Sequence, residues 1–298
     1  MTLLELVDQI LAELGFPKSS GVMASQERTV QQISALANRL GRDLTRDYDW
    51  RMLMREHILI TEARVMSASV TEGSYVVTVA DTSGLTTAWG LTGEGVRPFS
   101  QIISVDSPTQ VTLNMPADKS GTFDLTFSKV EYPLPSDWKK QLPQTEWDRT
   151  NRWPLIGPQT PQMWQSLKSG IVYAGIGEHF RIAGNSINLT PPPTNGLLIG
   201  FEYLSKNWVL GSDGVAKEAF TADDDTFIYD SSLLVLGVKS LFFQAKGFDS
   251  SLETTQFSAL IDRARAQDHS APALSLTGRF GRRRFIDNCN LPEGNWGH

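Results

Sequence analysis

Histidine and cysteine, which often carry catalysis or metal binding, are scarce in this sequence. The chain of 298 residues has 4 histidines and a single cysteine, Cys289. No two histidines stand at a spacing typical of metal ligands, and one thiol cannot complete a zinc site or an internal disulfide. His179 lies in a strand-like run, where we expect a packing role. The sequence therefore predicts no catalytic residue, no metal site and no cofactor.

Acidic side chains are the next candidates for chemistry. The run Asp223-Asp-Asp225 lacks the further oxygen ligands that a calcium loop places at set intervals. We expect these carboxylates to favour the start of a helix near Asp230 through the helix dipole. Glu146 and Asp148 suggest the paired acids of a glycosidase, but sequence spacing does not fix the distance between their carboxyl groups. We expect no catalytic pair here.

A basic and aromatic run near the C-terminus is the most distinctive feature of the sequence. Its candidate site residues are Phe280, Arg282, Arg283, Arg284, Phe285 and Trp296. The arginines could contact phosphates. Alternatively, the aromatic rings could fill pockets on a partner while the arginines pair with carboxylates. The simplest interpretation is a solvated flexible tail, and the sequence leaves all three open.

The charge of the whole chain limits its partners. The net charge is −6 and charged residues make up 20% of the chain. Domains that read DNA sequence are usually basic, so the balance argues against sequence-specific DNA binding. It still allows a protein that surrounds DNA, since an acidic wall would repel phosphates and let DNA slide past.

Compartment and membrane association also follow from composition. No apolar run approaches the ~20 residues that a membrane-spanning helix needs. The first residues are apolar on one face only and lack a basic leader, which predicts an amphipathic helix and no signal peptide. With one thiol, the fold does not depend on oxidising conditions. We expect folding in a reducing cytoplasm and no membrane partner.

Residues 1–55 predict a helical hairpin. The first helix begins with a capping box, in which the hydroxyl of Thr2 and the carboxylate of Glu5 satisfy free backbone N–H groups. The second helix begins near Ser25 and contains Gly41, where we expect a kink or a break. The link between the two helices is short, so they should lie side by side.

Residues 56–204 predict β structure. Short β-branched and aromatic runs are separated by Gly, Pro, Asn, Asp and Ser, as in a small sandwich or barrel. Residues 65–129 look like a self-contained β insert, with Val105–Val111 as a hairpin connection. The stretch 133–164 is rich in Pro and Trp, and long loop-rich segments are usually functional or interfacial.

Helical periodicity returns in residues 205–268. The helix after Asp230 is apolar over most of its circumference, so it should be covered on several sides. Another helix follows, with its cap near Ser250. We expect residues 228–268 to pack with the N-terminal hairpin, because each carries an apolar stripe that needs a partner.

The predicted fold class is therefore α+β. A helical hairpin or bundle comes from the N- and C-terminal segments, with an intervening β-sandwich or barrel region. Residues 270–298 have no hydrophobic period and predict an extended C-terminal arm.

The order of motifs resembles a known family. The motifs are Leu36–Arg39, Asp47–Trp50, Trp147–Pro158, Pro161–Trp164, Phe201–Val209, Phe220–Phe227, Leu233–Lys239 and Phe242–Gly247. In this order they are similar to the head-to-tail adaptors of short-tailed bacteriophages, the connectors related to tail tubular protein A. The resemblance covers both helical ends and residues 131–250, and the insert at 65–129 departs from the shortest adaptors.

The resemblance implies a structural virion protein, not an enzyme, made in the host cytoplasm. It implies a ring, a dodecamer in many such adaptors, in the neck of the virion. The ring would bind the portal protein on one side and a tail tube or nozzle protein on the other, with tail fibres as further candidate partners. Genomic DNA would pass through the channel without sequence specificity. C-terminal segments of such adaptors often grip the portal, which implies a portal-docking role for residues 270–298.

Other functions remain open at this point. A tail tube or fibre-anchoring protein would differ from an adaptor in ring stoichiometry and in its position in the virion. A tail-associated cell-wall hydrolase would need acids such as Glu146, Asp148 or Glu178, and a turbidity assay on cell wall would detect it. A carbohydrate-binding module would use the aromatic residues of the insert, which are few.

Overall fold

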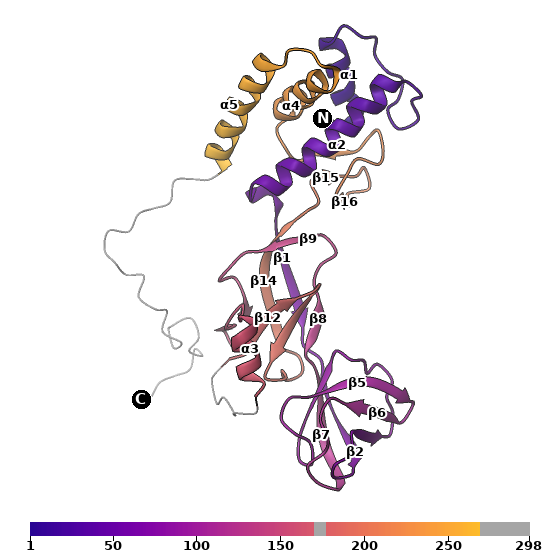
Figure 1. The fold of residues 1–298 in the computed structure, drawn as a ribbon, viewed down its shortest axis with the longest axis vertical. Helices are drawn as coiled ribbons and strands as arrows, with labels where there is room; N and C mark the ends of the chain where they lie inside the picture. The colour runs from indigo at the N-terminus through magenta and orange to yellow at the C-terminus, as the bar shows by residue number, and fades with distance from the viewer. Residues whose placement is uncertain (170–176, 269–298) are drawn as a thin grey trace, which may run out of the picture. The chain divides into compact units, whose positions relative to one another are not determined.

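The computed structural model describes residues 1–169 and 177–268, which form two compact units. The helical unit comprises Met1–Arg55, Asp137–Gln141 and residues 203–268, and the β unit comprises Glu56–Ser136 and residues 142–169 and 177–202. Figure 1 shows the helices and strands of each unit. The predicted α+β class is confirmed.

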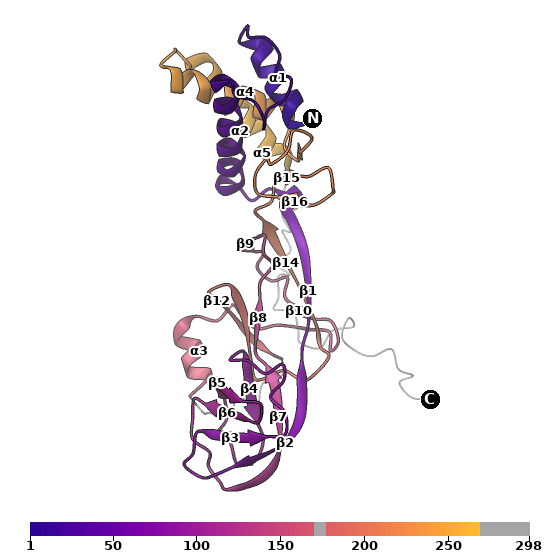
Figure 2. The ribbon, with the colours of Figure 1, turned by 90° about the vertical axis from the view of Figure 1, so that its right-hand side faces the viewer.

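The helical unit contains most of the helices. Its helical elements are α1 (Leu3–Glu13), α2 (Arg28–Asp47), η1 (Arg51–Leu53), α4 (Ser231–Lys246) and α5 (Ser251–Asp268). Its short strands are β9 (Trp138–Gln141), β15 (Val209–Leu210), β16 (Ala216–Lys217) and β17 (Thr226–Phe227). Strand β15 pairs with both β16 and β17. Helix α4 contacts α1, α2 and α5, so it is covered on several sides as its apolar circumference predicts (Figures 1 and 2).

The first helix begins as the sequence predicts. Glu5 N–H donates to Thr2 Oγ1 at 3.2 Å, and Thr2 N–H donates to the Glu5 carboxylate at 2.8 Å, which completes the capping box. The buried residues of α1 are apolar and share one face: Leu3, Leu6, Val7, Ile10 and Leu11. Local hydrogen bonding therefore fixes the start of α1, and its apolar stripe fixes its orientation.

The expected break at Gly41 is wrong. Helix α2 begins at Arg28, three residues after the expected start, and continues through Gly41 to Asp47. A side chain at Gly41 would overlap the ring of Trp208, which is fully buried. Phe220 meets the Trp208 ring edge-on at 5.0 Å, and Tyr229 stacks on it at 5.9 Å. Gly41 is thus a site of close packing between α2 and an aromatic cluster.

The C-terminal end of α2 is closed by side chains from other elements. Lys139 of β9 donates to the carbonyl of Thr45, and to that of Tyr48 at 3.2 Å. Trp50 Nε1 donates to the carbonyl of Leu44 at 2.9 Å. The last carbonyls of a helix lack partners within the helix and carry partial negative charge. A cation and an indole N–H therefore satisfy this end.

Helix α4 has a cap at each end and a glycine at its centre. The Asp230 side chain accepts from Ser232 N–H at 2.7 Å, and Gly247 ends the helix with φ +74°. A Cβ at Gly237 would lie 2.5 Å from Leu40 of α2 and 2.7 Å from Phe257 of α5. One missing side chain thus allows two neighbouring helices to approach α4.

The acidic run at 223–225 makes contacts that the sequence does not predict. The Asp223 carboxylate accepts from the backbone N–H groups of Val22 and Met23 at 3.0 and 2.8 Å. Asp225 is fully buried and accepts from the backbone N–H groups of Thr221 and Ala222 and from Lys217. These carboxylates hold two loops in place, and Asp230, which lies outside the run, caps α4.

A closed barrel forms one part of the β unit. Its strands are β2 (Ala63–Val70), β3 (Val76–Val79), β4 (Trp89–Thr92), β5 (Ser100–Ser107), β6 (Gln110–Leu113) and β7 (Gly121–Lys129). They close in the order β2-β3-β6-β5-β4-β7, with antiparallel neighbours (Figure 2). The predicted β5–β6 hairpin is confirmed, with Val105 opposite Val111. The barrel has an apolar core of its own, which includes the buried residues Val77, Leu91, Ile102, Leu125 and Phe127.

The remaining elements lie wholly or mainly in the β unit. They are β1 (Met54–Ile60), β8 (Glu131–Pro133), β10 (Trp147–Asp148), β11 (Trp153–Pro154), α3 (Pro161–Leu167), β12 (His179–Ala183), β13 (Ser186–Thr190) and β14 (Leu198–Ser205). Strands β12, β13 and β8 form one sheet. In a second sheet β14 lies between β1 and β10, and its last residues pair with β9. The stretch 133–164 thus contains short strands and the start of α3.

Replacing Gly41 tests the packing of Trp208. In an exposed helix Gly→Ala stabilises by about 1 kcal/mol. At Gly41 the added methyl group would overlap the Trp208 ring. We expect Gly41→Ala to lower the free energy of unfolding by about 1–3 kcal/mol, as in other overpacked cores. Urea unfolding followed by tryptophan fluorescence measures the change.

The exposed position Ala35 of the same helix provides the control. Ala35→Gly should cost about 1 kcal/mol through helix propensity alone. A Gly41→Ala protein that is as stable as the parent, or more stable, would contradict the close-packing role.

Asp225 predicts a pH dependence of stability. Burial would raise the pKa of Asp225, but hydrogen bonds from Thr221, Lys217 and Ala222 outweigh it and lower the pKa. The folded state therefore favours the carboxylate. Its contribution is present above the usual Asp pKa of about 3.9 and is lost as the pH falls through the lowered value. Asp225→Asn should cost about 1–3 kcal/mol at neutral pH.

Thermal unfolding of Asp225→Asn at neutral and acidic pH tests this expectation. The variant should lose less stability than the parent on acidification, because the group that titrates has been removed. The exposed neighbour Asp224 is the matched control, and Asp224→Asn should behave like the parent. Parallel stability curves for Asp225→Asn and the parent would show that the carboxylate does not stabilise the fold.

Candidate functional site

The C-terminal candidates Phe280, Arg282, Arg283, Arg284, Phe285 and Trp296 lie outside the described residues, as does the expected arm at 270–298. The described chain ends at Asp268, the last residue of α5. Helix α5 is therefore the described element that leads into the basic and aromatic segment, and its surroundings form the candidate site.

Helix α5 lies on the surface of the helical unit. None of its residues is buried, whereas α4 beside it buries Leu233, Leu234 and Val238 among others. Its N-terminal half meets α4 through Phe257, which approaches Gly237, and through a hydrogen bond of 2.9 Å between the hydroxyls of Thr254 and Ser240. A helix with so little burial gains little stability from tertiary packing.

The last turns of α5 are held by residues near the end of α2. Tyr48 Oη donates to the Arg265 carbonyl at 3.2 Å, and the Arg265 guanidinium lies 5.5 Å from the centre of the Tyr48 ring. Arg51 N–H donates to the Asp268 carboxylate at 3.0 Å. These contacts give the following segment a defined point of departure.

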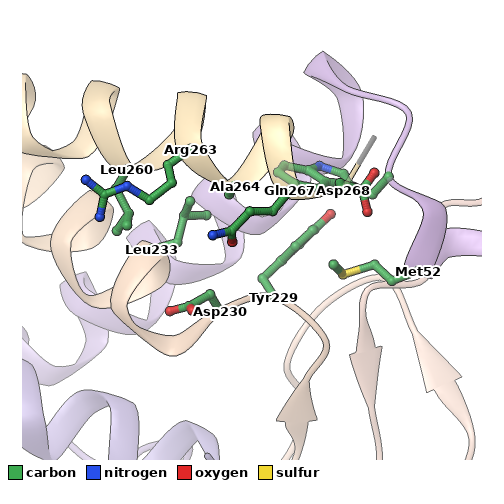
Figure 3. A pocket seen from close by; sticks show the side chains of 10 residues that line it. Met52, Tyr229, Asp230, Leu233, Leu260, Arg263, Ala264, Gln267 and Asp268 are labelled. Carbon is green, nitrogen blue, oxygen red and sulfur yellow. The ribbon is translucent and has the colours of Figure 1, made fainter. Parts of the chain in front are cut away.

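A half-open pocket of about 280 Å³ lies at this end of α5 (Figure 3). It is lined by Trp50, Met52, Tyr229, Asp230, Leu233, Leu260, Arg263, Ala264, Gln267 and Asp268. Trp50, Tyr229 and Leu233 are buried and apolar, and the rings of Trp50 and Tyr229 meet edge-on at 5.6 Å. The α5 residues Arg263, Gln267 and Asp268 add polar groups to the lining. Such a lining can receive an apolar side chain and bind a polar group beside it.

Three polar residues of this pocket, Tyr229, Asp230 and Asp268, have structural partners. Tyr229 Oη and Thr45 Oγ1 share a hydrogen bond of 2.7 Å, and burial raises the pKa of Tyr229. Asp230 caps α4, and Asp268 accepts from Arg51. These three side chains are thus already engaged by other residues of the helical unit.

The acids named for a hydrolase lie elsewhere, in the β unit. Asp148 is fully buried and accepts from the backbone N–H groups of Thr150 and Asn151 at 2.9 and 3.2 Å and from the Asn151 side chain. Burial raises the pKa of Glu146, and burial together with the charge of Asp148 raises that of Glu178. Asp148 thus closes a local turn, which accounts for its burial without catalysis.

His179 has a structural setting too. It pairs with Thr190 in the β12–β13 ladder, and its Nδ1 lies 3.0 Å from the side-chain nitrogen of Gln159. Burial lowers its pKa. Within residues 1–169 and 177–268 no three His, Cys, Asp or Glu side chains are arranged to hold a metal ion. No helix in that part of the chain is long and apolar enough to cross a bilayer.

An exposed apolar surface also lies on the β unit. Ile58 and Ile60 alternate along β1 and are 46% and 59% exposed, and Leu198 on the neighbouring β14 is 42% exposed. On the opposite face of these strands, His57 contacts Phe201 with ring centres 5.2 Å apart. We call Ile58, Ile60 and Leu198 the sheet patch. Strand periodicity indicates such alternation, but only the neighbouring strands show which face stays open.

A comparison of the chain with protein-family models and with curated proteins finds no match. The functional argument therefore depends on the surfaces just described and on the motif order in the sequence.

Hydrogen exchange tests the status of α5. Because α5 buries no residue, its amides should exchange faster than those of α4 or α2 under native conditions. Phe257→Ala removes its contact at Gly237 and should speed exchange throughout α5 while α1 stays protected. Peptide-resolved exchange followed by mass spectrometry gives both rates. Equal protection of α5 and α4 would show that α5 is an integral part of the core.

Proposed function

We propose that the chain is a structural virion protein, a head-to-tail adaptor that forms a ring between the portal and the tail of a short-tailed phage. The observation that carries the proposal is that each unit exposes an apolar surface of a different kind. The β unit has the sheet patch, and the helical unit has Phe248 and Leu252 at the start of α5, which are 62% and 63% exposed. We call this pair the helix patch.

Two unlike surfaces on one chain suit a ring. A head-to-tail contact between identical subunits uses one surface of one copy and a different surface of the next, and it closes when the rotation between copies permits. A two-fold dimer would instead use one self-complementary surface. Burial of the sheet patch against the helix patch of a neighbouring copy would remove both from water. The resemblance to head-to-tail adaptors implies a dodecamer as the closed form.

The finer fold proposed from the sequence fits this role. The helical hairpin, with α4 and α5, would form a bundle in the ring wall, and residues 270–298 would extend as an arm that docks on the portal. The contacts of Arg265 and Asp268 with the end of α2 support this part of the proposal, since they fix where the arm begins. Aromatic and arginine side chains in such an arm are the types that dominate binding energy at interfaces.

The barrel would act as a separate module. Its core is made of its own residues, so it does not depend on ring contacts for burial. We propose that it meets the tail tube, nozzle or fibres, or stiffens the ring. This assignment accounts for its absence from the shortest adaptors that the sequence resembles.

Other structural roles and a hydrolase predict different outcomes. A tail tube or fibre-anchoring protein would bind tail components without binding the portal. A hydrolase would clear a suspension of cell wall, and Glu146→Gln or Glu178→Gln would abolish the clearing. The raised pKa values of these two carboxyls are the observation behind that alternative, because a general acid must hold its proton.

Deletion of residues 270–298 tests the adaptor proposal. Light scattering and negative-stain imaging of the full chain with its portal should show a ring bound to the portal. The shortened chain should keep its fold, as seen by circular dichroism, but fail to bind the portal. Normal portal binding by the shortened chain would overturn the docking role of the arm.

A matched pair of surface variants separates ring formation from docking. Ile60→Ser in the sheet patch should weaken self-association, whereas Val65→Ser, at an equally exposed position of the barrel, should not. A full-length chain that neither forms a ring alone nor binds the portal would shift the assignment to a fibre anchor or a hydrolase, which the cell-wall assay would then distinguish.

A further inference from the structure

A second pocket on the helical unit gathers positive charge. It has a volume of about 160 Å³ and is lined by Arg42, Thr45, Arg46, Lys139, Lys206 and Glu218. Four cationic side chains therefore surround one carboxylate, in a chain whose net charge is −6. No apolar side chain lines this pocket, in contrast to the one beside α5.

Three separate segments bring the cations together. Arg42 and Arg46 stand one turn apart on α2 and are both exposed, so their side chains lie on the same face of the helix. Lys139 comes from β9 and is positioned by its hydrogen bonds to the carbonyls of Thr45 and Tyr48. Lys206 directly follows β14. The fold therefore concentrates charges that are far apart in the sequence.

The carboxylates nearby are already engaged with the lysines. Glu218 lies 3.5 Å from Lys206, and Asp49 lies 3.4 Å from Lys139 and 2.6 Å from Lys140. Within the part of the chain that the structure describes, neither Arg42 nor Arg46 forms an ion pair with a carboxylate. Two guanidinium groups therefore remain available to an external anion.

We propose that this pocket binds backbone phosphates of double-stranded DNA. A guanidinium group presents paired N–H donors that match a phosphate, and the nearby lysines add positive charge. A protein partner would be expected to place apolar or aromatic side chains at the centre of its interface, and this pocket offers none. Contacts of this kind position DNA without reading its sequence.

The proposal rests on the proposed function for the source of the DNA, which is the genome passing through the ring. The proposal changes one expectation drawn from the net charge, namely that the wall around the DNA is acidic throughout. Most of the acidic chain would repel the phosphates of DNA, while the cations at this pocket would attract them locally. A ring would repeat these points at equal intervals around its axis.

Binding of a short DNA duplex to the full-length chain tests the proposal. Fluorescence anisotropy at several salt concentrations between about 50 and 200 mM gives the slope of log K against log salt. For the double variant Arg42→Gln/Arg46→Gln we expect weaker binding and a slope smaller by about 1.8, since each phosphate contact contributes about 0.9. Two duplexes of unrelated sequence should lose affinity equally.

The matched control is Arg28→Gln/Arg39→Gln. It changes the net charge by the same amount on the same helix, at positions outside the pocket, and Arg39 already faces Asp43 at 3.6 Å. This control should retain most of the affinity and of the salt slope. An equal loss in both double variants would overturn the site, because net charge would then explain the effect.

Two further results would also overturn the proposal. One is an unchanged salt slope in the Arg42/Arg46 variant. The other is loss of self-association in light scattering with DNA binding intact, because the pocket would then meet carboxylates of another copy. These outcomes are distinct from failure of the adaptor proposal, which concerns ring formation and portal binding by the parent chain without DNA.

Discussion

The helical unit depends on the close approach of Trp208 to helix α2 at Gly41. A large ring can lie there only because residue 41 has no side chain. The ring also contacts Phe220 and Tyr229, and Tyr229 contacts Trp50 in turn. This continuous aromatic cluster connects the middle of α2 with the segment that enters α4 and with the turn that leaves α2. Densely packed aromatic clusters tolerate little displacement, so the positions of these segments are set together.

Stability is distributed unevenly across that unit, and the distribution matches the proposed roles. Helix α4 is covered by its neighbours, whereas α5 buries none of its residues; Phe257 packs against α4 at one end, and Arg265 and Asp268 contact residues near the end of α2 at the other. An element that must engage a partner benefits from being held without being buried, because its free surface and its order are both needed. The open pocket beside Trp50 is lined partly by α5, so it combines an ordered helix with accessible surface.

Local features of this chain were predictable from sequence, as was the packing of α4 against the N-terminal helices, but specific contacts between distant residues were not. The capping box at Thr2 and the β5–β6 hairpin depend on residues a few positions apart, and both are confirmed. Gly41 suggested a break in the helix, because the sequence does not show that the Trp208 ring, from a distant segment, packs against it. The acidic run at 223–225 suggested an interaction with the dipole of the helix that follows it. The sequence does not show that Asp223 binds the loop at Val22, because that loop is distant in sequence. The basic pocket combines α2, β9 and the end of β14, and no sequence window contains all three.

The two ends of the closed barrel lie next to each other, which affects how this part of the chain can be inserted or lost during evolution. Its first and last strands, β2 and β7, pair along their length from Ala63 opposite Ser128 to Val70 opposite Gly121, and Lys129 N–H donates to the Glu62 carbonyl at 2.8 Å. The chain therefore enters and leaves the barrel at adjacent points. Insertions of this geometry leave the spacing of the flanking segments almost unchanged. Recombination between genomes can then gain, lose or exchange the module as a unit, so its sequence can evolve independently of the flanking chain.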